Sequence, residues 1–413
     1  MPAPLPIDAD GALALLRRAE RLFLPGCTGE PTALHAIIAR DPGAVANLSV
    51  LTSFVAGLNP LDCGLLRHCR EVASFFPLPS ALPGRHRRLS GSYFGIDMEI
   101  RRQAPDILFV PVTLPDAAGR VTPGLSAEFV ETAMQGASVR IAVVSAALPA
   151  LATGPFLPMD RFTHVLRDDS PPPLLAAGAA DGLSDMIAGH VARLVGDGAV
   201  LQMGIGKVPT ALARHLTGRR GLRIHSGMVT MAVRDLADAG ALDRDHPVVA
   251  ATLSGDLGFY NWLRNRNDIS LHPIRHTHHP AVLAGLQGLM AVNSAIEVDL
   301  LGQVNAERIG GRQVSAAGGL PDFAAAARRV PDGCAVIALP ATDATGTRSR
   351  IVARLTPDVP VSVPRHDVDV VVTEHGIADL RGLGVGERAA ALAGIAAPSF
   401  RAALHRDAAA LEG

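Results

Sequence analysis

The chain contains a strand–turn–helix unit with the sequence Ala199-Val-Leu-Gln-Met-Gly-Ile-Gly-Lys-Val-Pro209. Its apolar first half predicts a buried strand, and the residues from Thr210 to Leu216 predict the helix that follows. Glycines between the two let the backbone approach a ligand, and a helix N-terminus offers unpaired N–H groups to phosphate. The turn has neither the third glycine of a dinucleotide fingerprint nor the Gly-Lys-Ser/Thr of a P-loop, so by itself it favours a plain tight turn.

Short apolar strands and helical patterns alternate along the rest of the chain. This alternation predicts an α/β protein with two open, mostly parallel sheets, because the helices that join parallel strands cover the sheet faces. The predicted strands are 46–51, 107–110, 139–144, 199–203, 248–253, 289–292, 335–339, 361–363 and 368–372, and the predicted helices are 11–22, 32–40, 126–135, 210–216 and 387–411.

A break between two halves is marked by Asp168-Asp-Ser-Pro-Pro-Pro173. Turn formers are followed here by a stiff proline run, which is typical of a linker. A chain of 413 residues, of which 48% are hydrophobic, has enough apolar surface for two cores. We therefore predict an N-terminal domain over residues 1–172 and a C-terminal domain over residues 173–413.

Charge and composition favour a small-molecule partner. The net charge is −1, so no basic surface draws the chain to nucleic acid. The N-terminus lacks the basic flank and apolar core of a signal peptide, and no run reaches the roughly eighteen apolar residues of a membrane span. We expect a cytoplasmic protein. Its four cysteines follow no metal or disulfide spacing, which favours reduced, buried thiols.

A dense group of histidines lies in Leu271-His-Pro-Ile-Arg-His-Thr-His-His-Pro280. No carboxylate or cysteine completes a regular ligand pattern nearby, and the prolines indicate an exposed loop. We therefore predict no metal site for His272, His276, His278 and His279.

Four blocks of the second half carry a family resemblance. They are 201–209, Asn293-Ser-Ala-Ile-Glu-Val-Asp-Leu-Leu-Gly-Gln-Val-Asn-Ala-Glu307, Gly318-Gly-Leu-Pro-Asp-Phe323 and 364–382. In these blocks the chain resembles the acetyl-CoA hydrolase/transferase family, which includes acetate, butyrate, 4-hydroxybutyrate and succinate CoA-transferases. The first half resembles the family more thinly, at Gly29-Glu-Pro-Thr-Ala-Leu34. The resemblance implies two CoA-transferase-type domains with the active site in the cleft between them, and it makes a homodimer plausible.

The resemblance also implies a mechanism that this chain lacks the means to follow. In the family, a glutamate attacks the acyl-CoA thioester, CoA thiolate opens the resulting anhydride, and the enzyme's glutamyl-CoA passes CoA to a second carboxylate. That glutamate belongs to a His-Ser/Thr-Glu-Met-like segment, where this chain has His225-Ser-Gly-Met228. Gly227 therefore stands at the position of the nucleophile and has no side chain to attack with.

Other site residues follow from the same resemblance. Asn293 would orient the reactive carboxylate or bind the thioester, or alternatively it caps the end of its strand. The backbone amides near Gly318 and Gly319 would receive the thioester oxygen. Coenzyme A or acyl-CoA would enter as a substrate, and no permanently bound cofactor is implied. The residues that would line the acyl-CoA site are Gly204, Ile205, Gly206, Lys207, Val208, Gly318 and Gly319.

Three hypotheses about the chemistry stay open. In the first hypothesis, the chain is a catalytically silent relative that either binds acyl-CoA or serves as a partner subunit. Alternatively, another carboxylate, Glu297 or Glu374, replaces the missing glutamate. In the third hypothesis, which we favour, the thioester site is kept and a small acceptor (water, amine, alcohol, carboxylate or carbon nucleophile) attacks directly. Water would give hydrolysis, and a bound amine, alcohol or carbon nucleophile would give acyl transfer. His225 is then a candidate general base, although a structural role also fits it.

Overall fold

The computed structural model describes residues 3–55, 58–59, 66–78, 82, 84–176, 178, 180–264 and 266–411. The chain forms two compact units. Unit 1 comprises Met1–Ala177 and Pro247–Thr277, and unit 2 comprises Gly178–His246 and His278–Gly413. None of the helices in the described ranges combines the length and the apolar character that crossing a bilayer requires.

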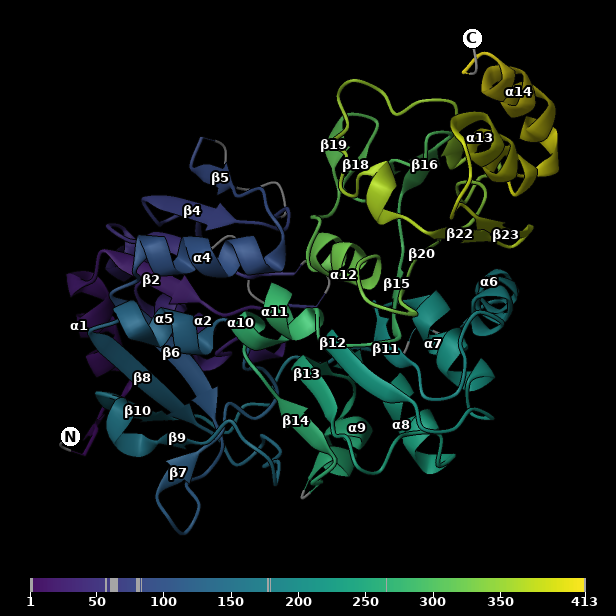
Figure 1. Cartoon of the computed structure of the whole chain (residues 1–413). Helices are drawn as coiled ribbons and strands as arrows, with labels where there is room; N and C mark the ends of the chain where they lie inside the picture. Colours follow the sequence, from purple (N-terminus) through teal and green to yellow (C-terminus); the bar gives the residue numbers. More distant parts are fainter. Residues whose placement is uncertain are drawn as a thin grey trace. The chain divides into compact units, whose positions relative to one another are not determined.

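Unit 1 is built on a sheet whose strands all pair in parallel, in the order β1-β10-β8-β6-β2-β3-β4-β5 (Figure 1). A separate antiparallel pair joins β7 to β9. The strands are β1 Leu5–Pro6, β2 Arg21–Leu24, β3 Ser49–Thr52, β4 Glu71–Ser74, β5 His86–Arg88, β6 Ile107–Val112, β7 Arg120–Val121, β8 Val139–Val144, β9 Leu157–Pro158 and β10 His164–Arg167.

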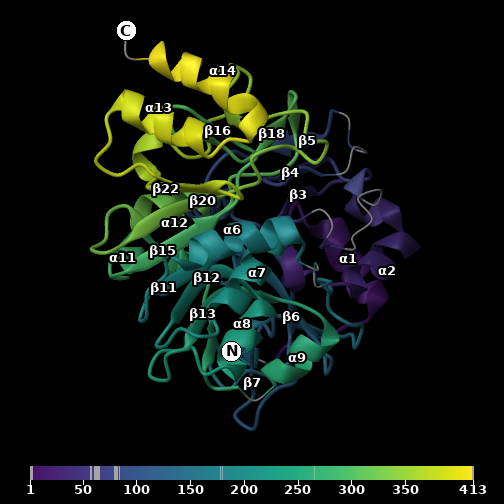
Figure 2. The same cartoon turned by 90° about the vertical axis from the view of Figure 1, so that its right-hand side faces the viewer.

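Helices cover both faces of this sheet, as its almost continuously apolar strands require. Successive strand residues point to opposite faces, so Leu22 packs into one core and Phe23 into the other. The first core takes the buried sides of α1 and α2, which lie side by side (Figure 2). The second takes those of α4 and α5. These helices are α1 Ala9–Arg18, α2 Ala33–Arg40, α4 Tyr93–Gln103 and α5 Val130–Gly136, and short 3₁₀ turns occur at Cys27–Gly29, Pro42–Val45 and Met159–Arg161.

The segment Pro247–Thr277 packs in unit 1, although part of unit 2 precedes it in the chain. The amide of Leu253 in its first strand, β13, donates to the carbonyl of Leu125 at 2.8 Å. The compact units are therefore discontinuous, whereas the predicted division at residue 172 is contiguous and stays a prediction about domains. The elements of the segment are β13 Val248–Ser254, α9 Leu257–Leu263, β14 Ile269–Leu271 and α10 Ile274–Thr277.

Unit 2 has its own sheet, which includes the strands β12-β11-β15-β20-β22-β23 in this order. The first five pair in parallel, and β23 pairs antiparallel to β22 at the edge. A core joins β15, β20 and β22 to α12, α13 and α14. Helices α13 and α14 lie side by side, and α6 packs along α7 (Figures 1 and 2).

The elements of unit 2 have the following bounds. The main strands are β11 Val200–Met203, β12 Arg223–Thr230, β15 Leu289–Asn293, β20 Cys334–Ala338, β22 Val370–Thr373 and β23 Gly376–Asp379. The short strands are β16 Glu297–Asp299, β17 Val304–Asn305, β18 Arg308–Ile309, β19 Arg312–Gln313 and β21 Ile351–Val352. The helices are α6 Gly182–Ala192, α7 Lys207–His215, α8 Ala232–Asp238, α11 Pro280–Leu283, α12 Leu320–Ala327, α13 Val385–Gly394 and α14 Pro398–Ala409, with a 3₁₀ turn at Arg365–Asp367.

The predicted fold class, α/β with mostly parallel sheets, is confirmed, and several predicted elements differ in their bounds or type. The predicted helix 11–22 is shorter, because its apolar end lies in β2. The predicted helix 387–411 is two helices, because Pro398 has no N–H to continue a helix and instead begins α14. The predicted strand 361–363 forms only an isolated bridge to β17.

A buried carboxyl group lies where the segment Pro247–Thr277 packs on the rest of unit 1. Glu128 is only 4% exposed. Burial raises the pKa of Glu128 to about 7, and hydrogen bonds with Thr252, Cys27 and Ser53 offset this only in part. Its Oε2 atom has no hydrogen-bond partner among the described residues. The carboxyl group therefore stays protonated up to near-neutral pH.

The raised pKa of Glu128 predicts that unfolding depends on pH. An ordinary glutamate has a pKa of 4.5, so between that pH and about 7 the folded chain keeps a proton that the unfolded chain has lost. Stability therefore falls as the pH rises through this window. Glu128→Gln keeps the shape but has no proton to lose, so above pH 7 it is expected to be more stable than wild type by roughly 3 kcal/mol at most.

Urea unfolding of the whole chain at pH 5 and pH 8 measures this effect. Glu131, in the first turn of α5 and 45% exposed at its side chain, supplies the control variant Glu131→Gln. Equal shifts in the two variants, or no difference between the two pH values, would contradict the role given to Glu128.

Candidate functional site

The strand–turn–helix unit forms as β11, a turn and α7, and α7 begins three residues earlier than predicted, at Lys207. Gly206 has a φ of 112°, a conformation that favours glycine. Lys207 Nζ lies 2.8 Å from the Asp181 carboxylate, and this hydrogen bond lowers the pKa of Asp181. Ile205 is 45% exposed and Val208 is buried. Backbone geometry and an ion pair thus hold the turn, with Ile205 on the surface.

Asn293 ends β15 beside the same turn. Its side-chain amide exchanges two hydrogen bonds with Gln202 of the neighbouring strand β11, at 2.7 and 3.2 Å. Its Oδ1 also lies 3.8 Å from the place where a Cβ on Gly204 would stand. The structure therefore brings Asn293 and Gly204 together at the carboxyl ends of two parallel strands, which is the edge at which open α/β sheets bind ligands.

Gly227 lies within the unbroken strand β12, two residues after His225. A Cβ built on Gly227 would lie 2.8 Å from Cε1 and 3.0 Å from Nε2 of His278. Apart from its own chain neighbours, no other heavy atom of the described residues lies within 4 Å of that Cβ. Any side chain at this position therefore requires His278 to move.

His278 is buried, with 1% of its surface exposed. Its ring meets the ring of Phe323 edge-on, with 4.7 Å between the centroids, and His225 approaches the same phenylalanine at 6.3 Å. Burial, and to a smaller extent the charge of a protonated His225, lower the pKa of His278 to about 3. The imidazole is therefore uncharged at neutral pH.

The exposed loop predicted for the histidine group is wrong at His278. Two prolines led to that prediction, but Pro280 occupies the first turn of α11, where a proline is well tolerated, and His278 packs inward just before it.

Gly318 and Gly319 lead into α12, and Gly318 has a φ of 58°. Neither backbone amide donates a hydrogen bond within the described part of the chain. A Cβ on Gly319 would collide with Nε2 of His278 and lie 2.9 Å from its Cδ2. The ring of His278 is thus enclosed between Gly227 and Gly319. We call His225, Gly227, His278, Gly319 and Phe323 the His278 cluster.

Glu297 and Glu374, the two carboxylates predicted as alternative nucleophiles, both accept hydrogen bonds. Glu297 Oε1 accepts a hydrogen bond from Asn305 Nδ2 at 2.9 Å. Glu374 Oε2 accepts one from the amide of Ala341 at 2.9 Å. Neither carboxylate has an atom within 4 Å of a Cβ built on Gly227. These bonds support structural roles for both residues.

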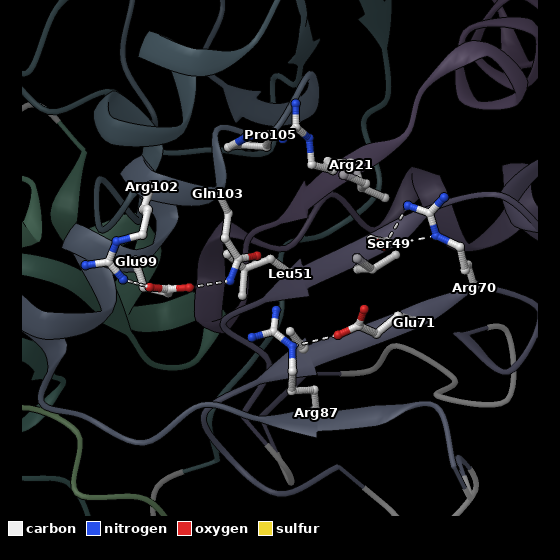
Figure 3. A pocket seen from close by; sticks show the side chains of 13 residues that line it. Arg21, Ser49, Leu51, Arg70, Glu71, Arg87, Glu99, Arg102, Gln103 and Pro105 are labelled. Atoms are coloured by element: carbon white, nitrogen blue, oxygen red, sulfur yellow. Dashed lines mark hydrogen bonds and ion pairs between the residues drawn. The ribbon is translucent and has the colours of Figure 1, made fainter.

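A cavity of about 290 Å³ lies in unit 1, and none of the predicted site residues lines it. Glu71 pairs with one of its arginines and Glu99 with another (Figure 3). The first residues of β2, β3 and β4 line it, so it opens at the amino-terminal edge of the sheet. Open α/β sheets bind ligands at the opposite edge, and we therefore do not assign the thioester site to it. Its arginines are Arg21, Arg70, Arg87 and Arg102.

Sequence reasoning missed the burial of His278, Glu128 and Glu30, among other titratable side chains. His278 had only its place in a dense histidine run as a signal, and Glu128 had none. Glu30, which is 3% exposed, pairs with His35 and accepts a hydrogen bond from Asn59. Its signal was its place in the block 29–34 that resembles the family.

No metal centre is found among the described residues, because no group of three or more His, Cys, Asp or Glu side chains is arranged to hold an ion. His272 and His276 instead stack on each other, with 4.2 Å between ring centroids. Cys27, Cys69 and Cys334 are buried free thiols, as predicted, and Cys63 lies outside the described residues.

Sequence comparisons identify relatives over most of the chain. Residues 255–408 match the model of the acetyl-CoA hydrolase/transferase C-terminal domain. The 4-hydroxybutyrate coenzyme A transferase of Clostridium kluyveri is 28% identical over 410 residues, which is 96% of each chain. The succinyl-CoA:cyclohexane-1-carboxylate CoA transferase of Geobacter metallireducens is 30% identical over 305 residues, which cover 72% of this chain and 70% of the relative.

Solved structures share the fold. The 4-hydroxybutyrate CoA-transferase of Porphyromonas gingivalis superposes with a TM-score of 0.84 at 26% identity, over 98% of both chains. RipA from Yersinia pestis superposes with a TM-score of 0.90 at 24% identity, over 99% of this chain and 98% of its own. The 30% identity to the Geobacter metallireducens transferase, over more than two thirds of both chains, together with the matched C-terminal family model, shows that this chain belongs to the acetyl-CoA hydrolase/transferase family.

Proposed function

We propose that this chain binds an acyl-CoA thioester and passes its acyl group directly to a small acceptor, without a glutamyl-CoA intermediate. The observation that carries the proposal is the pair of Gly227 and His278. The position of the family nucleophile has no side chain, and an imidazole ring fills the space beside it. Water as the acceptor gives a thioester hydrolase, and an amine or alcohol gives an acyltransferase.

Two further features support a thioester site. The amides of Gly318 and Gly319 stand at the start of α12 without a partner in the described residues, so they are suited to receive a carbonyl oxygen. Donors placed there stabilise the negative charge of a tetrahedral intermediate, whichever nucleophile made it. The turn that begins at Gly204 and the amide of Asn293 form the adjoining part of the proposed acyl-CoA site.

Two alternatives stay open. In one, a carboxylate elsewhere in the chain carries CoA in place of the family's glutamate. This requires Glu297 or Glu374 to give up the hydrogen bonds described above. In the other, the chain is a non-catalytic acyl-CoA-binding or partner subunit. The relatives include acetyl-CoA hydrolases, such as that of Saccharomyces cerevisiae at 29% identity, which favours turnover with water as acceptor. The homodimer that the family resemblance implies and the cytoplasmic location expected from the sequence both go with our proposal.

Incubation with a panel of acyl-CoA thioesters tests the proposal. We expect release of free CoA thiol, at a rate that depends on the acceptor supplied: water, amine, alcohol or carboxylate. Mass spectrometry of the intact protein is expected to show no CoA adduct, because residue 227 has no carboxylate to form one. A CoA adduct would support the second carboxylate, and thioester binding without any thiol release would support the silent subunit.

Restoring the glutamate gives a second prediction. Gly227→Glu alone is expected to form no glutamyl-CoA, because its Cβ would meet His278 ring atoms at 2.8 and 3.0 Å. The double variant Gly227→Glu with His278→Ala clears that space and is expected to gain CoA transfer between carboxylates, seen as a CoA adduct on the intact protein. His278→Ala alone is the control. An adduct in the single Gly227→Glu variant but not in the double variant would show that His278 does not fill the position.

A further inference from the structure

The ring of His278 packs against Gly319, whose amide is one of the two proposed to bind the thioester oxygen. Its Nε2 and Cδ2 atoms lie so close to the place of a Cβ on Gly319 that no room is left for one. Phe323, on the first turn of α12, packs edge-on against the same ring. The ring therefore has little freedom to turn away from the start of α12.

The state of this ring suits one kind of chemistry. The ring is uncharged at neutral pH because burial lowers the pKa of His278 to about 3. A neutral imidazole has an N–H donor on one ring nitrogen and an acceptor on the other. A ring that is so hard to protonate is a weak base and a poor nucleophile, since both abilities follow basicity. Its N–H group, in contrast, is an effective donor to an oxygen on which negative charge develops, as neutral histidines at carbonyl groups show.

Resting on the proposed function, we propose that His278 is a catalytic residue that donates a hydrogen bond from its uncharged ring to the thioester carbonyl oxygen, beside the Gly319 amide. The ring lies next to Gly227, so it occupies the approach of the family's glutamate and contributes a donor in place of a nucleophile. Such a donor costs no charge burial, and it acts most strongly in the transition state, where the oxygen is most negative.

The reaction balances with water as the acceptor. The water oxygen forms a bond to the thioester carbon, and the carbonyl electrons move to the oxygen that His278 and the Gly319 amide hold. When the carbonyl re-forms, the carbon–sulfur bond breaks and CoA leaves as a thiolate. One proton of the water goes to this thiolate and the other is lost to solvent when the carboxylic acid ionises. His278 keeps its proton throughout.

The test compares substitutions that keep or remove a donor at position 278. His278→Leu has no donor and is expected to lower kcat by roughly 10²–10³-fold with a small change in KM, which is the usual effect of losing one such donor. His278→Asn has an amide donor and is expected to retain more activity than His278→Leu. His279→Asn is the matched control, because His279 precedes α11 as its capping residue and asparagine is also a good cap. It is expected to keep wild-type kcat.

A spectroscopic readout separates donation from a merely structural role. An acyl-CoA analogue with CH₂ in place of sulfur and a ¹³C-labelled carbonyl binds without turnover. We expect its bound C=O stretch to lie lower in wild type and His278→Asn than in His278→Leu, because hydrogen bonding weakens that bond. A wild-type stretch in His278→Leu, or wild-type kcat in that variant, would overturn the role of His278. If His278→Leu fails to fold, as judged by circular dichroism, His278→Ala takes its place in both comparisons.

The failure of the inference is distinguishable from failure of the proposed function. If wild-type protein releases no thiol from any thioester, the proposed function fails. If it does release thiol and the variants at position 278 match it, only the role of His278 fails.

Discussion

The candidate site depends on one steric constraint: the imidazole ring of His278 leaves no room for a side chain at residue 227 or at residue 319. His278 fills the volume that a Cβ at Gly227 or at Gly319 would need, so the three residues specify one another. Protein interiors are close-packed, and a collision of this kind is relieved only by moving the ring or the backbone. The identity of residue 227 is therefore set by packing as well as by chemistry, and the absence of a carboxylate there is part of a consistent local arrangement.

The electrostatics of the site agree with this packing. A family glutamate at residue 227 would bring a negative charge next to the start of α12. The imidazole brings none, because burial keeps it neutral. The amides of Gly318 and Gly319 donate no backbone hydrogen bond within the described residues, and in our proposal they receive the substrate oxygen. The side-chain pair of Asn293 and Gln202 is likewise neutral.

Much of the fold follows from local sequence patterns, and the site follows only in part. The alternation of apolar strands and helices predicted the α/β fold class. The positions of β8 and α2 were predicted closely, because the spacing of apolar residues within each element determines which of its faces is buried. The proposed vacancy at Gly227 was predictable from the resemblance alone. The burial of His278 was not, since it depends on strand β12 and helix α12, which lie far from it in the chain. Glu128 was missed for the same reason, because its surroundings include Thr252.

The interleaving of the units also bears on how the protein is made. Residues 178–246 leave the ribosome before the segment Pro247–Thr277, which supplies Ala251 and Ile274 to a core of unit 1. The core of unit 1 is therefore incomplete until about a hundred residues after its proline run have been synthesised. For this reason unit 1 cannot finish folding before part of unit 2 has been made. Contacts between residues far apart in the sequence favour slow folding of unit 1. Until the segment Pro247–Thr277 is made, unit 1 exposes apolar surface that chaperones are suited to shield.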